Sequence, residues 1–249
     1  MKKVFTSLLI LNLLIFVGCK NKTKNQTVEP EPQTDSVSNE GMNTYAVIPS
    51  LVTENAQKFN DNITEQASQL NKLWEEGTVE NLYYNVEGQT VDNQIIPTIA
   101  YFIRASDIDK ARNILDQMIF RTKNIGSFEL IPVGNFLFGQ SEKAGDVRLK
   151  KQNVYVVVWD LLKPYDEVEP QNIQNQFDAD FKLYEEGILE NAYKNSPYDK
   201  SIKNFTVYFM NADSEEEAKK ILNEMPFVKS NIGSYKIRYV GHLMRGKAN

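Results

Sequence analysis

Three side chains able to do chemistry lie close together near the carboxyl end of the chain. Lys236, Arg238 and the single histidine, His242, alternate along residues 234–244, so a strand there would present them on one side. A row of cationic side chains could receive a carboxylate or another small anion. The same row could equally be a solvated edge of the sheet, and the spacing alone does not separate the two interpretations.

Two further charged residues end apolar segments. Asp160 follows Trp159 at the end of a very apolar run, where burial would raise the pKa of a carboxyl group toward that of a general base. Alternatively, Asp160 faces water at the end of its strand. Arg104 also ends an apolar run and could hold an anion.

The sequence predicts neither a metal site nor a cofactor. It has no cluster of His or Cys at metal-ligand spacing, no glycine-rich phosphate loop and no nucleophile elbow. The net charge is −5, which gives no electrostatic reason to expect a nucleic-acid partner. Apolar residues make up 41% of the 249 residues, enough for a sizeable core.

The first residues predict where in the cell the protein is located. Lys2 and Lys3 precede an apolar run that ends at Gly18, the pattern of a secretory leader too short to span a bilayer. The only cysteine follows at once, and Phe16-Val17-Gly18-Cys19 resembles the bacterial lipobox. That resemblance implies cleavage before Cys19, acylation of its thiol, and a membrane-anchored lipoprotein exported to the cell envelope. The polar residues up to about Met42 predict a disordered tether.

The body of the sequence is written twice. Residues 70–83 and 180–193 share the pattern Lys-Leu-aromatic-Glu-Glu-Gly, two apolar-rich positions and Glu-Asn, at a shift of 110. A second block at a shift of 107 aligns Asn124-Ile-Gly-Ser-Phe128 with Asn231-Ile-Gly-Ser-Tyr235. We interpret the body as a tandem duplication. Asn135 of the first copy aligns with His242 of the second copy, so any site that uses this strand differs between the copies.

Each copy predicts the element order β-α-β-β-α-β, the pattern of a ferredoxin-like module. Apolar strands open at 44–52 and 153–159, helices follow at 54–76 and 171–186, and Gly77 and Gly187 fall where helices end. Polar turns at 87–89 and 195–199 separate the next strand pairs. Helices at 107–118 and 214–225, capped by Ser106 and Asp213, lead to the closing strands.

These elements predict an α+β fold in which two ferredoxin-like repeats pack sheet against sheet within one chain. Aromatic residues of the repeats are interpreted as core, namely Trp74, Tyr83, Tyr84, Tyr184 and Tyr193. The expected organisation is a signal peptide at 1–18, the acylated cysteine and tether at 19–43, a first repeat at 44–139, a linker at 140–151 and a second repeat at 152–246.

The helix ends in Glu-Glu-Gly, the Met118-Ile-Phe120 and Met225-Pro-Phe227 segments and the closing Val-Gly strands resemble muconolactone isomerase and the YCII-related proteins. This resemblance implies a dimeric α+β barrel, fused here into one chain and so able to act as a monomer. It also implies proton transfer on a small carboxylate substrate. Resemblance to the YCII-related proteins also implies a His–Asp pair in each copy. With a single histidine, both copies cannot have one, which argues against catalysis.

Three hypotheses about function follow. The favoured one is a membrane-anchored lipoprotein whose fused barrel binds a small ligand, for example an anionic one, or a partner, without turnover. The alternatives are an isomerase or lyase and a structural component of the envelope. The candidate catalytic residues are Asp160 and His242, and the candidate ligand-binding residues are Arg104, Asn135, Lys236 and Arg238.

Overall fold

A computed structural model describes residues 42–138, 141–151, 153–195 and 204–245. Cys19, the leader and nearly all of the tether lie outside these residues, so acylation of Cys19 and the envelope address stay predictions. Among the described residues, no helix is both long and apolar enough to cross a bilayer.

Helices and strands alternate along the chain. The N-terminal half, which we define as 43–132, contains β1 (Asn43–Leu51), α2 (Ala56–Glu75), β2 (Val79–Val91), β3 (Gln94–Ala105), α3 (Ile108–Asp116), α4 (Ile119–Thr122) and β4 (Gly126–Pro132). The segments β5 (Asn135–Phe138) and α5 (Ala144–Lys151) follow. The C-terminal half, 153–245, contains β6 (Asn153–Leu161), a 3-10 turn (Tyr165–Glu167), α6 (Pro170–Glu185), β7 (Leu189–Lys194), β8 (Asn204–Ala212), α7 (Glu215–Asn223), α8 (Pro226–Lys229) and β9 (Gly233–Arg245).

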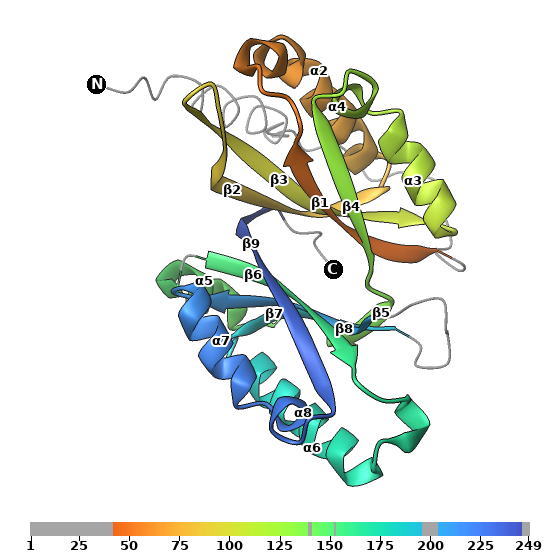
Figure 1. Cartoon of the computed structure of the whole chain (residues 1–249), viewed down its shortest axis with the longest axis vertical. Helices are drawn as coiled ribbons and strands as arrows, with labels where there is room; N and C mark the ends of the chain where they lie inside the picture. The colour runs from red at the N-terminus through yellow and green to blue at the C-terminus, as the bar shows by residue number, and fades with distance from the viewer. Residues whose placement is uncertain (1–41, 139–140, 152, 196–203, 246–249) are drawn as a thin grey trace, which may run out of the picture.

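Nine strands form one antiparallel sheet in the order β4-β1-β3-β2-β9-β6-β8-β7-β5. Within it, β2 of the N-terminal half pairs with β9 of the C-terminal half, and β5, which follows the N-terminal half, pairs with β7 of the C-terminal half. The helices lie on the outer sides of the strands in both halves (Figure 1). The predicted α+β class is confirmed, and the strands form one large antiparallel sheet.

The core between the two halves is aromatic. Tyr83 and Phe102 from the N-terminal half meet Tyr193 and Phe209 from the C-terminal half, and all four are buried. The Tyr83 and Phe209 rings stack with centroids 4.9 Å apart, and Phe102 lies 4.7 Å from Phe209. This packing confirms that Tyr83 and Tyr193 are core residues. The four buried rings also provide a large apolar contact between the two halves.

The long helices bury one stripe of side chains, as their spacing predicts. In α2 the buried positions include Phe59, Gln66 and Leu70, which recur at helical intervals. The helix ends at Gly77, whose φ is 72°, and Gly187 has a φ of 75° after α6. Both values lie in the left-handed region that glycine adopts without steric cost, so both predicted terminators are confirmed.

The second helix of each half begins one residue later than predicted. Asp107, rather than Ser106, is the N-cap of α3, and Ser214, rather than Asp213, is the N-cap of α7. The Ser214 Oγ accepts a hydrogen bond from the Glu217 backbone N–H at 3.2 Å. In both halves the side chain next along the chain thus satisfies the free N–H groups of the first turn.

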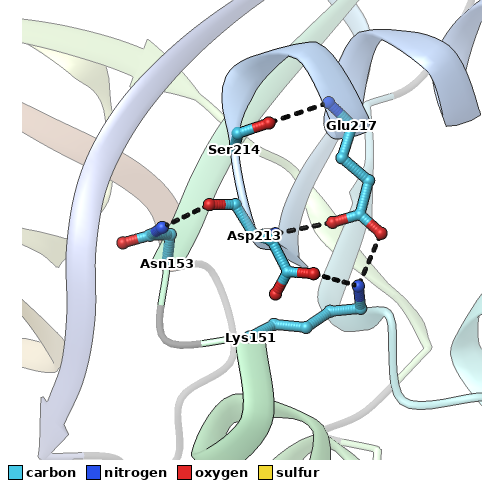
Figure 2. Close-up of polar contacts among 5 residues, drawn as sticks. All are labelled: Lys151, Asn153, Asp213, Ser214 and Glu217. Carbon is cyan, nitrogen blue, oxygen red and sulfur yellow. Dashed lines mark hydrogen bonds and ion pairs between the residues drawn. The ribbon is translucent and has the colours of Figure 1, made fainter.

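Further polar groups surround the start of α7. Lys151 Nζ donates to Glu217 Oε1 at 2.6 Å, and this hydrogen bond raises the pKa of Lys151 (Figure 2). Glu217 Oε2 in turn accepts from the Asp213 backbone N–H at 2.6 Å. These polar groups fix the start of a helix, which is a structural role.

Two further differences concern connections. The β2–β3 turn lies at Asp92-Asn93, both with positive φ, whereas the prediction placed it at 87–89. Gly88 instead lies where the β2–β3 register shifts, and its φ is 42°. The polar segment 140–151, predicted as a linker, contains the helix α5.

Candidate functional site

The structure brings together three of the six residues predicted to form a site. Asp160, Lys236 and Arg238 line one pocket with Glu129, where β4 of the N-terminal half faces β6 and β9 of the C-terminal half. Lys236 Nζ lies 3.2 Å from Asp160 Oδ2. Arg238 forms a bidentate ion pair with Glu129, with one contact, Nη2 to Oε1, at 3.0 Å.

This arrangement leaves little for an anion to bind. Each cationic side chain already has a carboxylate partner, so the pocket carries two compensated pairs. A free anion would have to compete with Asp160 or Glu129 for these cations, and both carboxylates are held next to them by the fold. The side chains are also well exposed, at 74% for Lys236 and 48% for Arg238, so solvent screens their charges.

His242 lies elsewhere. It pairs with Tyr84 where β9 meets β2, six residues along the strand from Lys236. Six residues of strand span roughly 20 Å, so His242 and Asp160 cannot act on one small substrate. Burial lowers the pKa of His242, although the charge of Glu87 opposes this shift. The prediction of Asp160 and His242 as two groups of one catalytic site is therefore not supported by their placement.

The other two candidates also stand apart. Arg104 lies at the end of β3, opposite Thr44 of β1, and Asn135 is an exposed residue of β5 opposite Lys194. Neither lines the pocket that contains Lys236 and Arg238. The six predicted residues thus occupy four places. Among the described residues, no group of three His, Cys, Asp or Glu side chains could hold a metal ion.

A different pocket lies on the outer side of the sheet, between α2 and the strands of the N-terminal half. We call it the outer pocket. It encloses a volume of about 60 Å³, within a wider hollow of about 570 Å³ that is open to solvent. Apolar and aromatic side chains dominate its lining, including Pro49, Phe59, Ile63, Tyr84, Phe120 and Phe128.

One strand position that lines the outer pocket differs greatly in side-chain size between the two halves. Pro49 of β1 lies opposite Phe128 of β4. In the C-terminal half Trp159 of β6 lies opposite Tyr235 of β9, which is the matching relationship. The Trp159 indole is buried, with its ring 5.9 Å from Tyr208 and 5.6 Å from Tyr235. A large ring fills this position in one half, whereas a small one occupies it in the other.

Two of the polar side chains that line the outer pocket are deeply buried. Gln66 and Tyr101 are buried, with exposures of 7% and 3%. Gln66 Oε1 accepts a hydrogen bond from the Phe120 backbone N–H at 3.1 Å, which fixes the orientation of its amide. Burial raises the pKa values of Tyr84 and Tyr101, so both phenols keep their protons at neutral pH.

No candidate residue predicted from the sequence lines the outer pocket. The interpretation of Tyr84 as a core residue was incomplete, since this half-buried side chain lines the pocket. In the predicted alignment of the two repeats, Gln66 is matched with Gln176, and Pro49 is matched with Trp159. Side-chain size along this alignment is the sequence signal for the pocket, because proline is much smaller than tryptophan.

No protein-family model matches this sequence, and no curated protein matches it. Several solved structures are similar at low sequence identity. A mutant chlorite dismutase from Candidatus Nitrospira defluvii is 10% identical, with 82% of this chain and 92% of that chain covered and a TM-score of 0.48. A heme-binding protein from Thermus thermophilus is 15% identical, with 81% and 90% covered and a TM-score of 0.46.

These comparisons correct the family interpretation. The resemblance to muconolactone isomerase and the YCII-related proteins was wrong: no family model supports it, and the similar structures are chlorite dismutases and a heme-binding protein. The functions expected with it, an anchored lipoprotein whose barrel binds a ligand without turnover, an isomerase, or a structural envelope component, are corrected too. Tyr83, Phe102, Tyr193 and Phe209 fill much of the space between the halves, and the pocket that remains there is the one whose cations, Lys236 and Arg238, are already paired with carboxylates.

Proposed function

We propose that this chain is a binding protein for a small, largely apolar molecule, held in the outer pocket between α2 and the sheet. The observation that carries the proposal is the exchange of Trp159 for Pro49 at matching places of the two halves. Closely packed cores leave few voids larger than a water molecule. A pocket kept open in one half, while a tryptophan fills its counterpart, suits a ligand.

We infer further that the two halves are copies of one ferredoxin-like unit, which together make a barrel. The strand orders β4-β1-β3-β2 and β9-β6-β8-β7 match when the elements are aligned. A matching hydrogen bond supports the same inference: Gln66 accepts from the Phe120 N–H, and Gln176 accepts from the Phe227 N–H at 3.0 Å. In such a duplicated chain, one copy can supply stability while the other keeps a pocket.

Heme does not fit the outer pocket well. The only histidine, His242, is not among the lining residues, which leaves Tyr84 and Tyr101 as the side chains there with a phenol hydroxyl for iron. A tyrosine ligand must lose its proton, and burial raises the pKa of both phenols. Within the described part of the chain, no lysine or arginine lines the pocket to receive the propionate groups of heme.

Binding of a neutral hydrocarbon tests the proposal. We expect α-methylstyrene to bind the whole protein at one saturable site, followed by NMR shifts of the Ile63 methyl groups. Pro49→Trp places the indole of the C-terminal half at the matching position, and it should weaken binding at least about tenfold. Ile95→Trp is the control, because Ile95 is 61% exposed and does not line the pocket.

The outcomes separate cleanly. Saturable binding that Pro49→Trp removes and Ile95→Trp keeps supports the proposal. Equal binding to all three proteins, or none to the wild type, overturns it. Hemin added to the wild type should give no saturable one-to-one spectral change, and a stoichiometric complex that Pro49→Trp abolishes would assign the pocket to heme instead.

A further inference from the structure

The C-terminal half contains a buried acceptor where the N-terminal half has its pocket. Asp180 of α6 is 3% exposed, and its Oδ1 accepts a hydrogen bond from Gln176 Nε2 at 2.8 Å. The Tyr208 hydroxyl is also hydrogen-bonded to this carboxyl group. One amide and one phenol therefore share a carboxyl acceptor beneath α6.

The N-terminal half has the same two donors without that acceptor. Gln66 matches Gln176 and Tyr101 matches Tyr208, but Leu70 stands where the other half has Asp180. Without a carboxyl oxygen nearby, both donors are directed at the sulfur atom of one methionine. Gln66 Nε2 lies 3.8 Å from Met118 Sδ, and the Tyr101 hydroxyl lies 3.3 Å from it.

A thioether is a weak acceptor, so both donors are poorly satisfied for groups so deeply buried. The Gln66 amide cannot exchange its oxygen and nitrogen positions by flipping, because its Oε1 accepts a hydrogen bond from the Phe120 N–H. Its NH₂ group is therefore fixed as the donor end. Both Gln66 and Tyr101 line the outer pocket, and Met118 does not.

We propose that the ligand of the outer pocket carries an uncharged oxygen acceptor, such as a ketone or ester carbonyl, that binds Gln66 and Tyr101. This inference rests on the proposed function and names its ligand class. The carbonyl oxygen does in the N-terminal half what Asp180 does in the C-terminal half. The remainder of the molecule is apolar and packs against the aromatic lining.

The acceptor is uncharged for two reasons. Among the residues that the structure describes, no lysine or arginine lines the pocket, so a carboxylate would lose its water without gaining a counter-ion. The protein's own carboxyl group in the matching place behaves accordingly, because burial raises the pKa of Asp180 to about 7. A neutral carbonyl satisfies the same donors at a smaller cost of desolvation.

A pair of ligands with the same shape tests this inference. Acetophenone and α-methylstyrene differ only in C=O against C=CH₂, and benzoate supplies the charged comparison. In a purely apolar pocket the ketone would bind more weakly, since it loses hydrogen bonds to water. We expect the wild type to bind acetophenone at least as tightly as α-methylstyrene and to show no saturable binding of benzoate.

Two variants locate the donors. Tyr101→Phe keeps the ring and removes the hydroxyl, so it should lower the ketone's relative affinity by about threefold to tenfold while leaving the hydrocarbon's unchanged. Leu70→Asn offers a competing oxygen of the protein's own and should lower the ketone's relative affinity similarly. Thermal unfolding of each variant checks that it is folded.

The failures are distinguishable. If α-methylstyrene binds as proposed but the ketone's relative affinity is unchanged in Tyr101→Phe, the carbonyl inference is wrong and the proposed function stands. Saturable binding of benzoate at this site would likewise overturn the uncharged acceptor. If neither neutral compound binds the wild type, the proposed function itself fails.

Discussion

The side-chain amide of Asn191 donates a hydrogen bond to the hydroxyl of Tyr83 over 3.1 Å, which joins residues 108 positions apart inside the core. Both side chains are buried, and they come from different halves. The Tyr83 ring also stacks on Phe209. One residue thus contributes a polar and an apolar contact across the junction of the two halves.

We expect Tyr83→Phe to lower the free energy of unfolding by about 1–3 kcal/mol, because the Asn191 amide loses a buried acceptor while the ring remains. Urea unfolding followed by circular dichroism measures the change. Tyr235→Phe is the matched control, since it removes an exposed bond to Asn223 Oδ1 at 2.8 Å. Equal effects of the two substitutions would contradict the role of the buried bond.

Asp180 makes stability depend on pH. Its pKa is raised to about 7 in the folded state, chiefly by burial, against an ordinary value of 3.8. Between these values the folded protein holds a proton that the unfolded chain has lost. The free energy of unfolding therefore falls as pH rises from about 4 to 7, and the loss is complete above 7.

Asp180→Asn keeps an oxygen acceptor and removes the titration. Compared with the wild type, we expect the variant to gain stability steadily between about pH 4 and 7, by as much as about 4 kcal/mol in total. Urea unfolding at several pH values gives the difference curve. A difference that stays flat across this range would show that Asp180 ionises freely in the folded protein.

Gly241 permits β9 to cross from β6 to β2. Its φ is 92°, and an added Cβ would lie 2.0 Å from the Tyr84 carbonyl oxygen. We expect Gly241→Ala to lower the free energy of unfolding by about 3 kcal/mol or more, since both the backbone angle and the contact are strained.

Gly145 supplies the control for that substitution. It lies in α5, and no atom of the described residues comes within 4 Å of an added Cβ. Gly145→Ala should therefore raise stability, by about 0.5–1 kcal/mol, through better helix propensity. Thermal unfolding of the two variants should move in opposite directions, and parallel shifts would rule out the steric explanation.

The ion pair between Arg238 and Glu129 joins the halves but should stabilise them little. Both side chains are nearly half exposed. A double-mutant cycle with Arg238→Ala and Glu129→Ala should give a coupling free energy of about 0–1 kcal/mol that decreases with added salt. A coupling of several kcal/mol, insensitive to salt, would mean that this pair is effectively buried.

The element order could be predicted from sequence because periodicity and terminators agree in each half. Leu70 is a buried residue of α2, and Gly77 follows the end of that helix with a positive φ, as helical spacing and the glycine predict. The β2–β3 turn was misplaced because Gly88 is as typical of a turn as Asp92-Asn93. The pairing of β2 with β3 continues beyond Gly88, so a register shift takes up its positive φ instead.

The candidate site was predicted poorly for a different reason. Residues able to do chemistry, such as Lys236 and His242, are easily recognised in a sequence, yet the strand separates them, and Lys236 is paired with a carboxylate. The outer pocket depends on side-chain volume, which is small at Pro49. Volume depends on what lies across a helix–sheet interface, and a single copy of the sequence does not report it.

The two crossing strand pairs, β2 with β9 and β5 with β7, have a consequence for the chain as a tool. Gly145 lies in α5, between β5 and β6, so a cut there interrupts that helix but no strand, and both strand pairs can form between the two fragments. Two separately expressed fragments should reassemble into the complete sheet and co-elute on gel filtration. The molecule would then serve as a split reporter whose signal requires both pieces to meet.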